Sequence, residues 1–288
     1  MLRLRNSLIL TIASVLLTNG PAVSQHRDLS EVSVNRCWQF PAESVVGLTT
    51  NGKDVFAAFG NGHVIALSAS GEKLWDTDLG GAVEAPMSYS RGFVAVATRS
   101  ASGAVVPHHL SDSSGVPSRE SAAAEPTASI ATPDTPTASG SDSLVVGNDS
   151  GLVTSLSGTG PVWKFKTGGA ISAIVAVGDL FVVISRDNFV YALRSRNGGL
   201  EWKRRLTGRV SHYAIAGKYL VASSMDQHGA SLIDLESGRV AGQVLLGGDD
   251  QLALDPVVVG DKLMFATGAG LSGYSLSDCG QKETASKP

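Results

Sequence analysis

Short apolar stretches alternate with glycine-containing polar turns from about residue 36 to residue 282. Within residues 163–202, WKFK alternates large apolar with basic residues. AISAIVAV and LFVVIS are apolar and largely β-branched, and FVYAL follows a polar turn. Period-two alternation and short apolar runs bounded by turns are typical of strands rather than helices. The pattern predicts an all-β domain, and we expect residues 163–202 to supply the four strands of one sheet.

Two sets of turn glycines recur in step along this region. One set follows a strand: Gly71, Gly115, Gly160, Gly198, Gly238 and Gly280. The other set precedes an apolar strand: Gly52, Gly92, Gly140, Gly178, Gly217 and Gly260. Each set repeats about every 40 residues, the length of a four-stranded propeller blade. Because a lone blade cannot bury both its faces, the repeats predict a β-propeller of about six four-stranded blades over residues 36–282.

The run Ala66-Leu67 followed by Gly71-Glu72-Lys73-Leu74-Trp75 resembles the repeat of pyrroloquinoline-quinone (PQQ)-type β-propellers. Ala192-Leu193 with Gly198 and Trp202 is similar, and residues 154–163 form a looser copy. In that family the tryptophan docks one blade onto its neighbour. The resemblance therefore implies docking roles for all the tryptophans of the chain: Trp38, Trp75, Trp163 and Trp202.

Two copies of the repeat depart from this pattern. Gly242 stands at the tryptophan position of one, and Arg119 or a neighbour stands there in the other, so we expect these two junctions to pack less well. Members of the family include quinoprotein dehydrogenases and the β-propeller lipoprotein of the outer-membrane assembly machinery. The resemblance is specific for the fold, whereas a propeller hosts many activities.

The two cysteines fall at related positions of the repeat. When SLSDCG is aligned with ALSASG and CW with LW, Cys279 takes the place of Ser70 and Cys37 that of Leu74, on the two sides of one hairpin. The repeat thus predicts that CWQF, near the N-terminus, is the outer strand of the last blade. A Cys37–Cys279 disulfide would replace the missing turn. Unpaired thiols and a metal or redox site are the alternatives.

The N-terminal residues predict export. Arg3 and Arg5 precede an apolar run over residues 8–17, and Ala22-Val23-Ser24 follows, so we interpret residues 1–24 as a signal peptide and 25–35 as a lead-in. The chain is expected in the periplasm or outside the cell, where paired cysteines oxidise. No segment is apolar enough over a sufficient length to predict a transmembrane helix.

Two segments have low complexity. Residues 118–143 are rich in Ala, Ser, Thr and Pro, and we interpret them as a loop that also contains the first strands of the third repeat, such as TASIAT. A partner-binding loop is the alternative. The tail, residues 283–288, is expected to be disordered.

The charge balance excludes an electrostatic nucleic-acid binder, because the chain has a formal net charge of −3 and that class needs a basic stripe. One basic cluster stands out in EWKRRLTGR, with two further arginines nearby: Lys203, Arg204, Arg205, Arg209, Arg194 and Arg196. Such a cluster either meets an acidic partner or forms a solvated strand face.

Catalytic motifs are not found in the sequence: there is no HExxH, GxSxG, P-loop or CxxC. His108 and His109 are adjacent on a predicted strand and face opposite ways. His63, His212 and His228 lack ligand spacing, so no catalytic or metal site is predicted. The segments entering the innermost strands would line the mouth of a central channel with these polar residues: Glu43, Ser44, Glu84, Ser172, Ser211, His212, Gln251 and Asp255.

Among these residues, Glu84 and Asp255 are the candidates for binding a cofactor, PQQ with calcium. The alternative is that both are ordinary rim carboxylates. We expect no cofactor and a monomeric, exported, non-catalytic scaffold that binds a protein or polymer partner in the cell envelope or outside the cell. The alternative function is a small-ligand or quinone-dependent oxidoreductase that uses the channel.

Overall fold

The structure is a computed structural model, which describes residues 32–84, 86–118, 136–139, 144–158, 160–247, 250–277 and 279. All of them belong to the second of two compact units, Glu31–Pro288. The predicted signal peptide, TASIAT, Arg119, Gly280 and the tail lie outside the described residues. In the described part of the chain, no helix is long and apolar enough to cross a bilayer.

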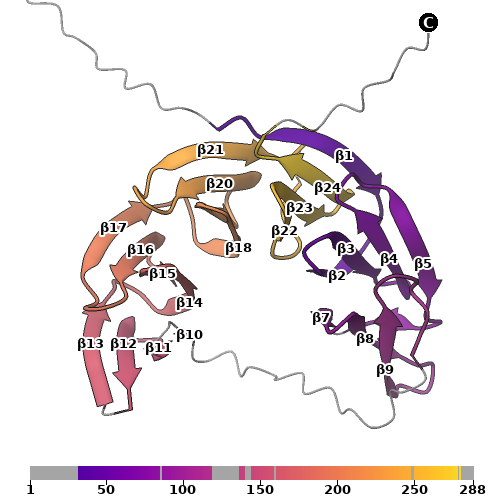
Figure 1. The fold of residues 1–288 in the computed structure, drawn as a ribbon, viewed down its shortest axis with the longest axis horizontal. Helices are drawn as coiled ribbons and strands as arrows, with labels where there is room; N and C mark the ends of the chain where they lie inside the picture. Colours follow the sequence, from indigo (N-terminus) through magenta and orange to yellow (C-terminus); the bar gives the residue numbers. More distant parts are fainter. Residues whose placement is uncertain are drawn as a thin grey trace, which may run out of the picture. The chain divides into compact units, whose positions relative to one another are not determined.

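The strands form antiparallel sheets that follow one another along the chain as blades 1 to 6 (Figure 1). Blade 1 contains β2 (Val45–Thr50), β3 (Asp54–Phe59), β4 (His63–Ser68) and β5 (Lys73–Asp78). In blade 2, β8 (Phe93–Arg99) pairs on one edge with β6 (Ala82–Val83) and β7 (Ser88–Ser90), and on the other with β9 (Val105–Ser111). An isolated bridge between Leu110 and Pro117 begins the next pairing of blade 2.

Blades 3 to 5 each have four strands in sequence order. Blade 3 contains β10 (Thr137–Ser139), β11 (Leu144–Gly147), β12 (Leu152–Ser157) and β13 (Gly160–Lys166). Blade 4 contains β14 (Ile171–Val177), β15 (Leu180–Ser185), β16 (Phe189–Arg194) and β17 (Leu200–Arg205). Blade 5 contains β18 (Val210–Ala216), β19 (Tyr219–Ser224), β20 (Gly229–Asp234) and β21 (Val240–Leu245).

Blade 6 is built from both ends of the folded unit. It contains β22 (Val257–Val259), β23 (Lys262–Thr267) and β24 (Gly270–Ser275), and its outer strand is β1 (Asn35–Pro41). β1 pairs antiparallel with β24, so that Trp38 lies opposite Gly273 and Pro41 opposite Gly270. The fold is therefore an all-β propeller of six blades in which an N-terminal strand completes the last blade, as the repeat predicted.

The expected sheet over residues 163–202 is wrong in phase. WKFK belongs to β13 and pairs with β12, so it is the outer strand of blade 3, and blade 4 takes β17 as its own outer strand. The repeat length fixes how often a blade recurs but not at which strand it begins. The outer strand of one blade and the inner strand of the next both contain apolar residues. Only the strand pairing shows to which blade such a segment belongs.

Within the described residues, most glycines of the two sets occupy turns. Gly160 instead begins β13, and Gly140 and Gly280 lie outside the described residues. Gly71 and Gly198, between the third and fourth strands of their blades, have φ of 81° and 67°. Gly52 and Gly178, between the first and second strands, have φ of 87° and 53°. A side chain is strained in this left-handed region, which explains why glycine recurs there.

A bulge recurs in the outer strand of five blades, one residue before the tryptophan position. The extra residue lies between two residues that pair with consecutive partners. These residues are Cys37, Leu74, Val162, Glu201 and Ala241. A bulge bends its strand and redirects the side chains that follow, and here it precedes the residue that contacts the next blade.

Hydrophobic clusters join consecutive blades. One cluster joins blades 1 and 2, another blades 3 and 4, and others blades 4 and 5, blades 5 and 6, and blades 6 and 1. Fully buried Phe56, Phe181 and Phe265 lie on the second strands of blades 1, 4 and 6. Among the described residues, no such cluster joins blade 2 to blade 3. Burial of both faces of each sheet makes stacking of blades the main source of stability.

Candidate functional site

The two carboxylates predicted at the channel mouth are engaged within the fold. Glu84, directly after β6, accepts a hydrogen bond of 2.6 Å from Nε of Arg99, at the end of β8 in the same blade. This hydrogen bond lowers the pKa of Glu84. Glu84 is thus part of an exposed ion pair between the end of β6 and β8 in blade 2, and its charge is already balanced.

Asp255 connects two blades. It precedes β22 of blade 6, and its Oδ1 accepts a hydrogen bond of 3.1 Å from the backbone N–H of Tyr213 in β18 of blade 5. Nδ1 of His212 lies 3.3 Å from the same oxygen. Asp255 therefore ties the innermost strand of blade 5 to the entry of blade 6.

These residues do not fit a calcium-bound quinone. Calcium takes six to eight oxygen ligands, several of them usually carboxylates. Glu84 and Asp255 belong to different blades, and each already has a cationic or N–H partner. In the described residues no three His, Cys, Asp or Glu side chains are grouped so as to hold a metal ion. We derive no chemistry through such a group.

The histidines are placed individually rather than as a set. Nδ1 of His63 lies 2.8 Å from Oδ1 of Asp76 on the neighbouring strand, and this hydrogen bond raises the pKa of His63. Nε2 of His108 lies 2.9 Å from the hydroxyl of Thr98, while burial lowers the pKa of His108. His108 and His109 pair with consecutive residues of β8 and so point to opposite faces of the sheet.

The four tryptophans each join one blade to the next, at the junctions of blades 6 and 1, 1 and 2, 3 and 4, and 4 and 5. Every indole Nε1–H donates to a backbone carbonyl just before the last turn of the following blade: Trp38 to Ala69 at 3.0 Å, Trp75 to Asp112 at 2.7 Å, Trp163 to Ser195 at 2.9 Å and Trp202 to Leu235 at 2.8 Å. Each ring also lies against the turn glycine of that blade, respectively Gly71, Gly115, Gly198 and Gly238. A Cβ at any of these glycines would lie 2.5 Å from a ring atom. One residue type thus provides both an apolar contact and a directional bond.

The junction between blades 5 and 6, where Gly242 replaces the tryptophan, is filled in another way. The backbone N–H of Val32 donates to the carbonyl of Ala241 at 2.7 Å. A Cβ at Gly242 would lie 2.6 Å from the carbonyl oxygen of Val32. Val32 and Val34 also pack against the cluster that joins these two blades. The lead-in to β1 therefore occupies the space that a tryptophan fills elsewhere, a substitution that the repeat alone did not reveal.

The cysteines close the chain of blades covalently. Sγ of Cys37 and Sγ of Cys279 are bonded, with Cα atoms 5.2 Å apart and a sequence separation of 242. Cys37 is the bulged residue of β1, not a residue directly paired with β24, and Cys279 lies beyond the end of β24. The disulfide takes the place that the turn between third and fourth strands has in the other blades.

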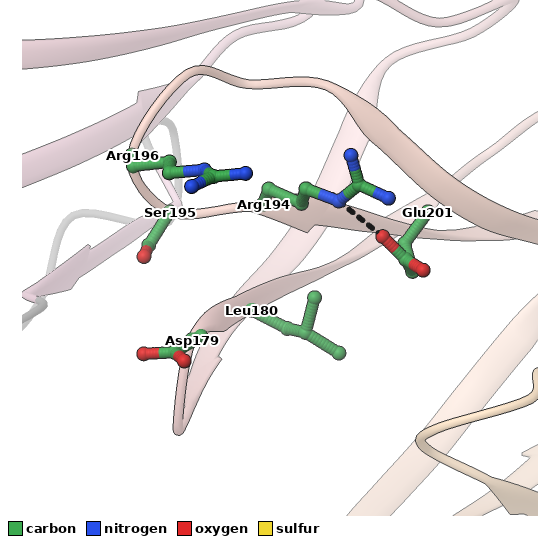
Figure 2. A pocket seen from close by; sticks show the side chains of 6 residues that line it. All are labelled: Asp179, Leu180, Arg194, Ser195, Arg196 and Glu201. Atoms are coloured by element: carbon green, nitrogen blue, oxygen red, sulfur yellow. Dashed lines mark hydrogen bonds and ion pairs between the residues drawn. The ribbon is translucent and has the colours of Figure 1, made fainter.

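A pocket of about 410 Å³ lies beside the β16–β17 turn of blade 4 (Figure 2). It is lined by Asp179, Leu180, Arg194, Ser195, Arg196 and Glu201. Figure 2 shows Nε of Arg194 bonded to Glu201, while Arg196 extends from the turn above Leu180. The backbone N–H of Ser195 donates to the backbone carbonyl of Asp179 at 2.8 Å. The backbone carbonyl of Ser195 accepts the hydrogen bond from the indole of Trp163.

Both signs of charge line this pocket, so it suits a ligand with anionic and cationic groups better than a simple anion. The sequence indicated Arg194 and Arg196 as part of a basic cluster. The sequence did not predict that Asp179 and Glu201 would line the same pocket. Asp179 lies in the β14–β15 turn and Glu201 is the bulged residue of β17, and the two become neighbours only when the strands pair.

The chain matches one family model and has the fold of solved propellers. Residues 25–162 and 158–283 match the model described as outer membrane protein assembly factor BamB. No curated protein matches the chain.

Three of the solved structures that are similar to it illustrate the likeness. The Cps50 (Swd1) β-propeller domain of Myceliophteria thermophila is 13% identical, with a TM-score of 0.53 over 85% of this chain and 100% of that one. The WD40 β-propeller domain of Doa1 is 9% identical, with a TM-score of 0.52 over 84% and 96%. BamB from Moraxella catarrhalis is 15% identical, with a TM-score of 0.40 over 85% and 96%. The first two show the β-propeller fold.

Proposed function

Because this chain belongs to the family described as outer membrane protein assembly factor BamB, we propose that it is an exported, non-catalytic β-propeller scaffold that binds a protein partner in the cell envelope or outside the cell. One observation carries the proposal: the side chains that could serve chemistry instead hold the frame together. Glu84 is paired with Arg99 and Asp255 with Tyr213, and each tryptophan joins two blades. The strand edges and turns of the propeller are therefore the parts that a partner would contact.

Rigidity supports a scaffold role. A surface that is already ordered loses little conformational entropy when a partner binds. The blades are held by paired strands, by indole hydrogen bonds and by a disulfide, and the lead-in fastens blade 5 to blade 6. Large partners can therefore contact several blades without a prior rearrangement.

Export is supported by the disulfide and by the N-terminal sequence. Disulfides persist in oxidising compartments and are rare in the cytosol. The basic and apolar N-terminal residues have the order of a secretory signal. Fractionation of host cells tests this part: the protein should be found in envelope or medium fractions, with the disulfide intact. Recovery with a cytosolic marker would contradict it.

Partner binding is tested by placing a photo-crosslinking amino acid at single exposed positions. Lys53 in the β2–β3 turn, Met225 after β19 and Leu245 at the end of β21 are exposed in three different places. Irradiation of host cells should give a discrete covalent adduct with the same protein from at least one position.

The competing function is tested on the same material. Purified protein supplied with PQQ and calcium should show no dye-linked oxidation of alcohols or sugars and no new quinone absorbance. Adducts from none of the three positions would overturn the scaffold proposal, and quinone-dependent turnover would support the competing oxidoreductase.

A further inference from the structure

Positive charge is concentrated in one part of this acidic chain. Residues 160–209 contain nine Lys and Arg against three Asp and Glu, a net charge of +6, whereas the whole chain has −3. This segment supplies β13, the outer strand of blade 3, and all of blade 4. The rest of the chain is accordingly strongly acidic, so the asymmetry is large enough to orient a charged partner.

Five of these cations lie on the outer strands of blades 3 and 4 or in the adjoining β15–β16 turn, and together we call them the basic surface: Lys164, Lys166, Arg186, Lys203 and Arg205. All five side chains are exposed. Lys164 and Lys166 are on β13, Lys203 and Arg205 are on β17, and Arg186 is in the β15–β16 turn. Figure 1 shows β13 and β17 as the outer strands of two successive blades.

Aromatic rings of both blades pack beneath the cations of β17. Lys164 and Lys166 flank Phe165 on β13 and therefore project from the opposite face of that strand. Phe165 of β13 and Tyr191 of β16 have ring centroids 5.7 Å apart, and Phe189 lies 6.0 Å from Tyr191. Nζ of Lys203 lies 5.5 Å from the centre of the Phe189 ring, and Phe189 pairs with Arg205. Blades 3 and 4 are therefore joined through these rings next to the cations of β17.

The β15–β16 turn is joined to the same region. The backbone N–H of Arg186 donates to Ala170 at 2.8 Å, and that of Gly168, just after β13, donates to Asp187 at 2.8 Å. Nζ of Lys166 donates to the carbonyl of Ser150 in the β11–β12 turn. Arg186 is thus held next to the end of β13.

The charge of the basic surface is not neutralised within the described residues, where none of its five cations forms an ion pair with a carboxylate. The nearby acids have other roles. Asp187 accepts hydrogen bonds from the Tyr191 hydroxyl at 2.6 Å and from the Phe189 N–H at 3.1 Å, and Glu201 is bonded to Arg194. Asp149, next to Ser150, is an exposed carboxylate at the border of the surface.

We propose that the basic surface binds an extended, acidic segment of the protein partner. This inference rests on the proposed function and assigns it a surface and a partner chemistry. Lys164 and Lys166, and likewise Lys203 and Arg205, are two residues apart on outermost strands. Side chains on one face of an extended polypeptide also repeat every second residue, so alternating Asp or Glu residues would match this spacing. An outermost strand in addition offers its free backbone edge for pairing with a partner strand.

The same spacing favours a polypeptide over other polyanions. A lipid surface needs no such periodicity. Domains that bind nucleic acid are typically strongly basic as a whole, whereas this chain has a net charge of −3. A structural alternative exists for edge-strand cations, since lysines there also prevent sheets from pairing edge to edge in aggregates. The experiment must separate these explanations.

A binding measurement with a defined probe does so. The probe is a fluorescein-labelled peptide of alternating Glu and Thr, compared with the Gln-Thr peptide, and the readout is fluorescence anisotropy with the full chain. The Lys203→Gln/Arg205→Gln variant should bind the acidic peptide about five- to tenfold more weakly, the loss expected for two exposed charge pairs. Binding by the unmodified protein should also weaken with salt.

The matched control is Lys53→Gln/Lys218→Gln, which removes the same charge from exposed turns of blades 1 and 5. Its affinity should stay within about twofold of the unmodified protein. Equal losses in both variants would overturn the inference, because net charge alone would then explain binding. If the Lys203/Arg205 variant binds the peptide unchanged but aggregates more, the cations would instead serve to prevent edge-to-edge pairing of sheets. Tighter binding to phosphatidylglycerol vesicles or to a DNA oligonucleotide would contradict the partner class.

Photo-crosslinking in host cells separates failure of this inference from failure of the proposed function. With the crosslinker at position 203, the adduct should map to an acid-rich segment of the partner. Adducts from positions 53, 225 or 245 but none from 203 would leave the scaffold intact and remove the basic surface as its binding site. Adducts from no position would remove the scaffold proposal itself, whatever the peptide binding shows.

Discussion

The indole of Trp163 lies directly on Gly198 of the next blade, where an added Cβ would be 2.5 Å from Cε3 of the ring. The same glycine has φ of 67°, which side chains rarely adopt. Blade docking and turn geometry therefore depend on one residue, and the same pair of requirements recurs at Gly71, Gly115 and Gly238.

Gly198→Ala should destabilise the protein by about 3–5 kcal/mol, because it adds steric overlap with Trp163 to left-handed backbone strain. Gly178→Ala is the matched control: its φ is 53°, but nothing lies within 4 Å of an added Cβ. That variant should lose only about 1–2 kcal/mol. Urea unfolding of both variants measures the difference, and equal losses would mean that Trp163 does not dock on Gly198.

Gly242→Trp distinguishes the structure from the repeat pattern. On the repeat pattern alone, this substitution would restore a docking tryptophan and increase stability. The structure predicts a loss of about 1–3 kcal/mol, since the Val32 carbonyl already occupies the space, 2.6 Å from an added Cβ. A higher denaturation midpoint for this variant would show that the lead-in is not bound at the junction.

Tyr191 should ionise at a higher pH than a free tyrosine. Burial raises the pKa of Tyr191 to about 12, and its hydrogen bond to Asp187 adds to the effect. The neutral phenol is the favoured form in the fold. The associated stability is therefore fully present below the unfolded pKa of about 10 and is lost as the pH rises through about 12.

Absorbance at the phenolate band during an alkaline titration measures this pKa. The phase with a midpoint near pH 12 should be missing in Tyr191→Phe, which should also lose about 1.5–3 kcal/mol because the charged Asp187 loses its donor. An unchanged titration curve in that variant would contradict the assignment.

Much of the architecture can be predicted from residue types that recur at fixed positions of the sequence repeat. Gly71 and Gly178 mark turns because few other residues tolerate their backbone angles. Trp75 and Trp202 each stand four residues after a turn glycine, Gly71 and Gly198 respectively. These local requirements, repeated along the chain, predicted the β-propeller, the number of its blades and the strand shared between its ends. The family match and the strand pairing confirm that fold.

What the sequence did not predict depends on contacts between distant segments. WKFK was assigned to the wrong blade because a strand reads the same whichever neighbour it pairs with. Val32 gave no signal, since its contact with Gly242 is made through its backbone carbonyl. The partners of Glu84 and Asp255 were equally invisible, because Arg99 and Tyr213 become neighbours only when strands pair or blades stack.

Cys37→Ser should lower the melting temperature under non-reducing conditions only. Closing a loop of this length limits the unfolded chain and is worth about 5 kcal/mol on the chain-entropy model. In the presence of a reductant, the variant and the unmodified protein should melt together. A loss of the same size with reductant present would mean that the serine perturbs packing rather than removing a cross-link.

The pairing of β1 with β24, locked by Cys37 and Cys279, is the claim on which the account depends most. Peptide mass mapping of unreduced protein, alkylated before digestion, tests it directly. We predict one disulfide-linked species that joins the peptide containing Cys37 to the peptide containing Cys279 and separates on reduction. Recovery of both peptides as alkylated free thiols, or of either one linked to another molecule, would contradict it.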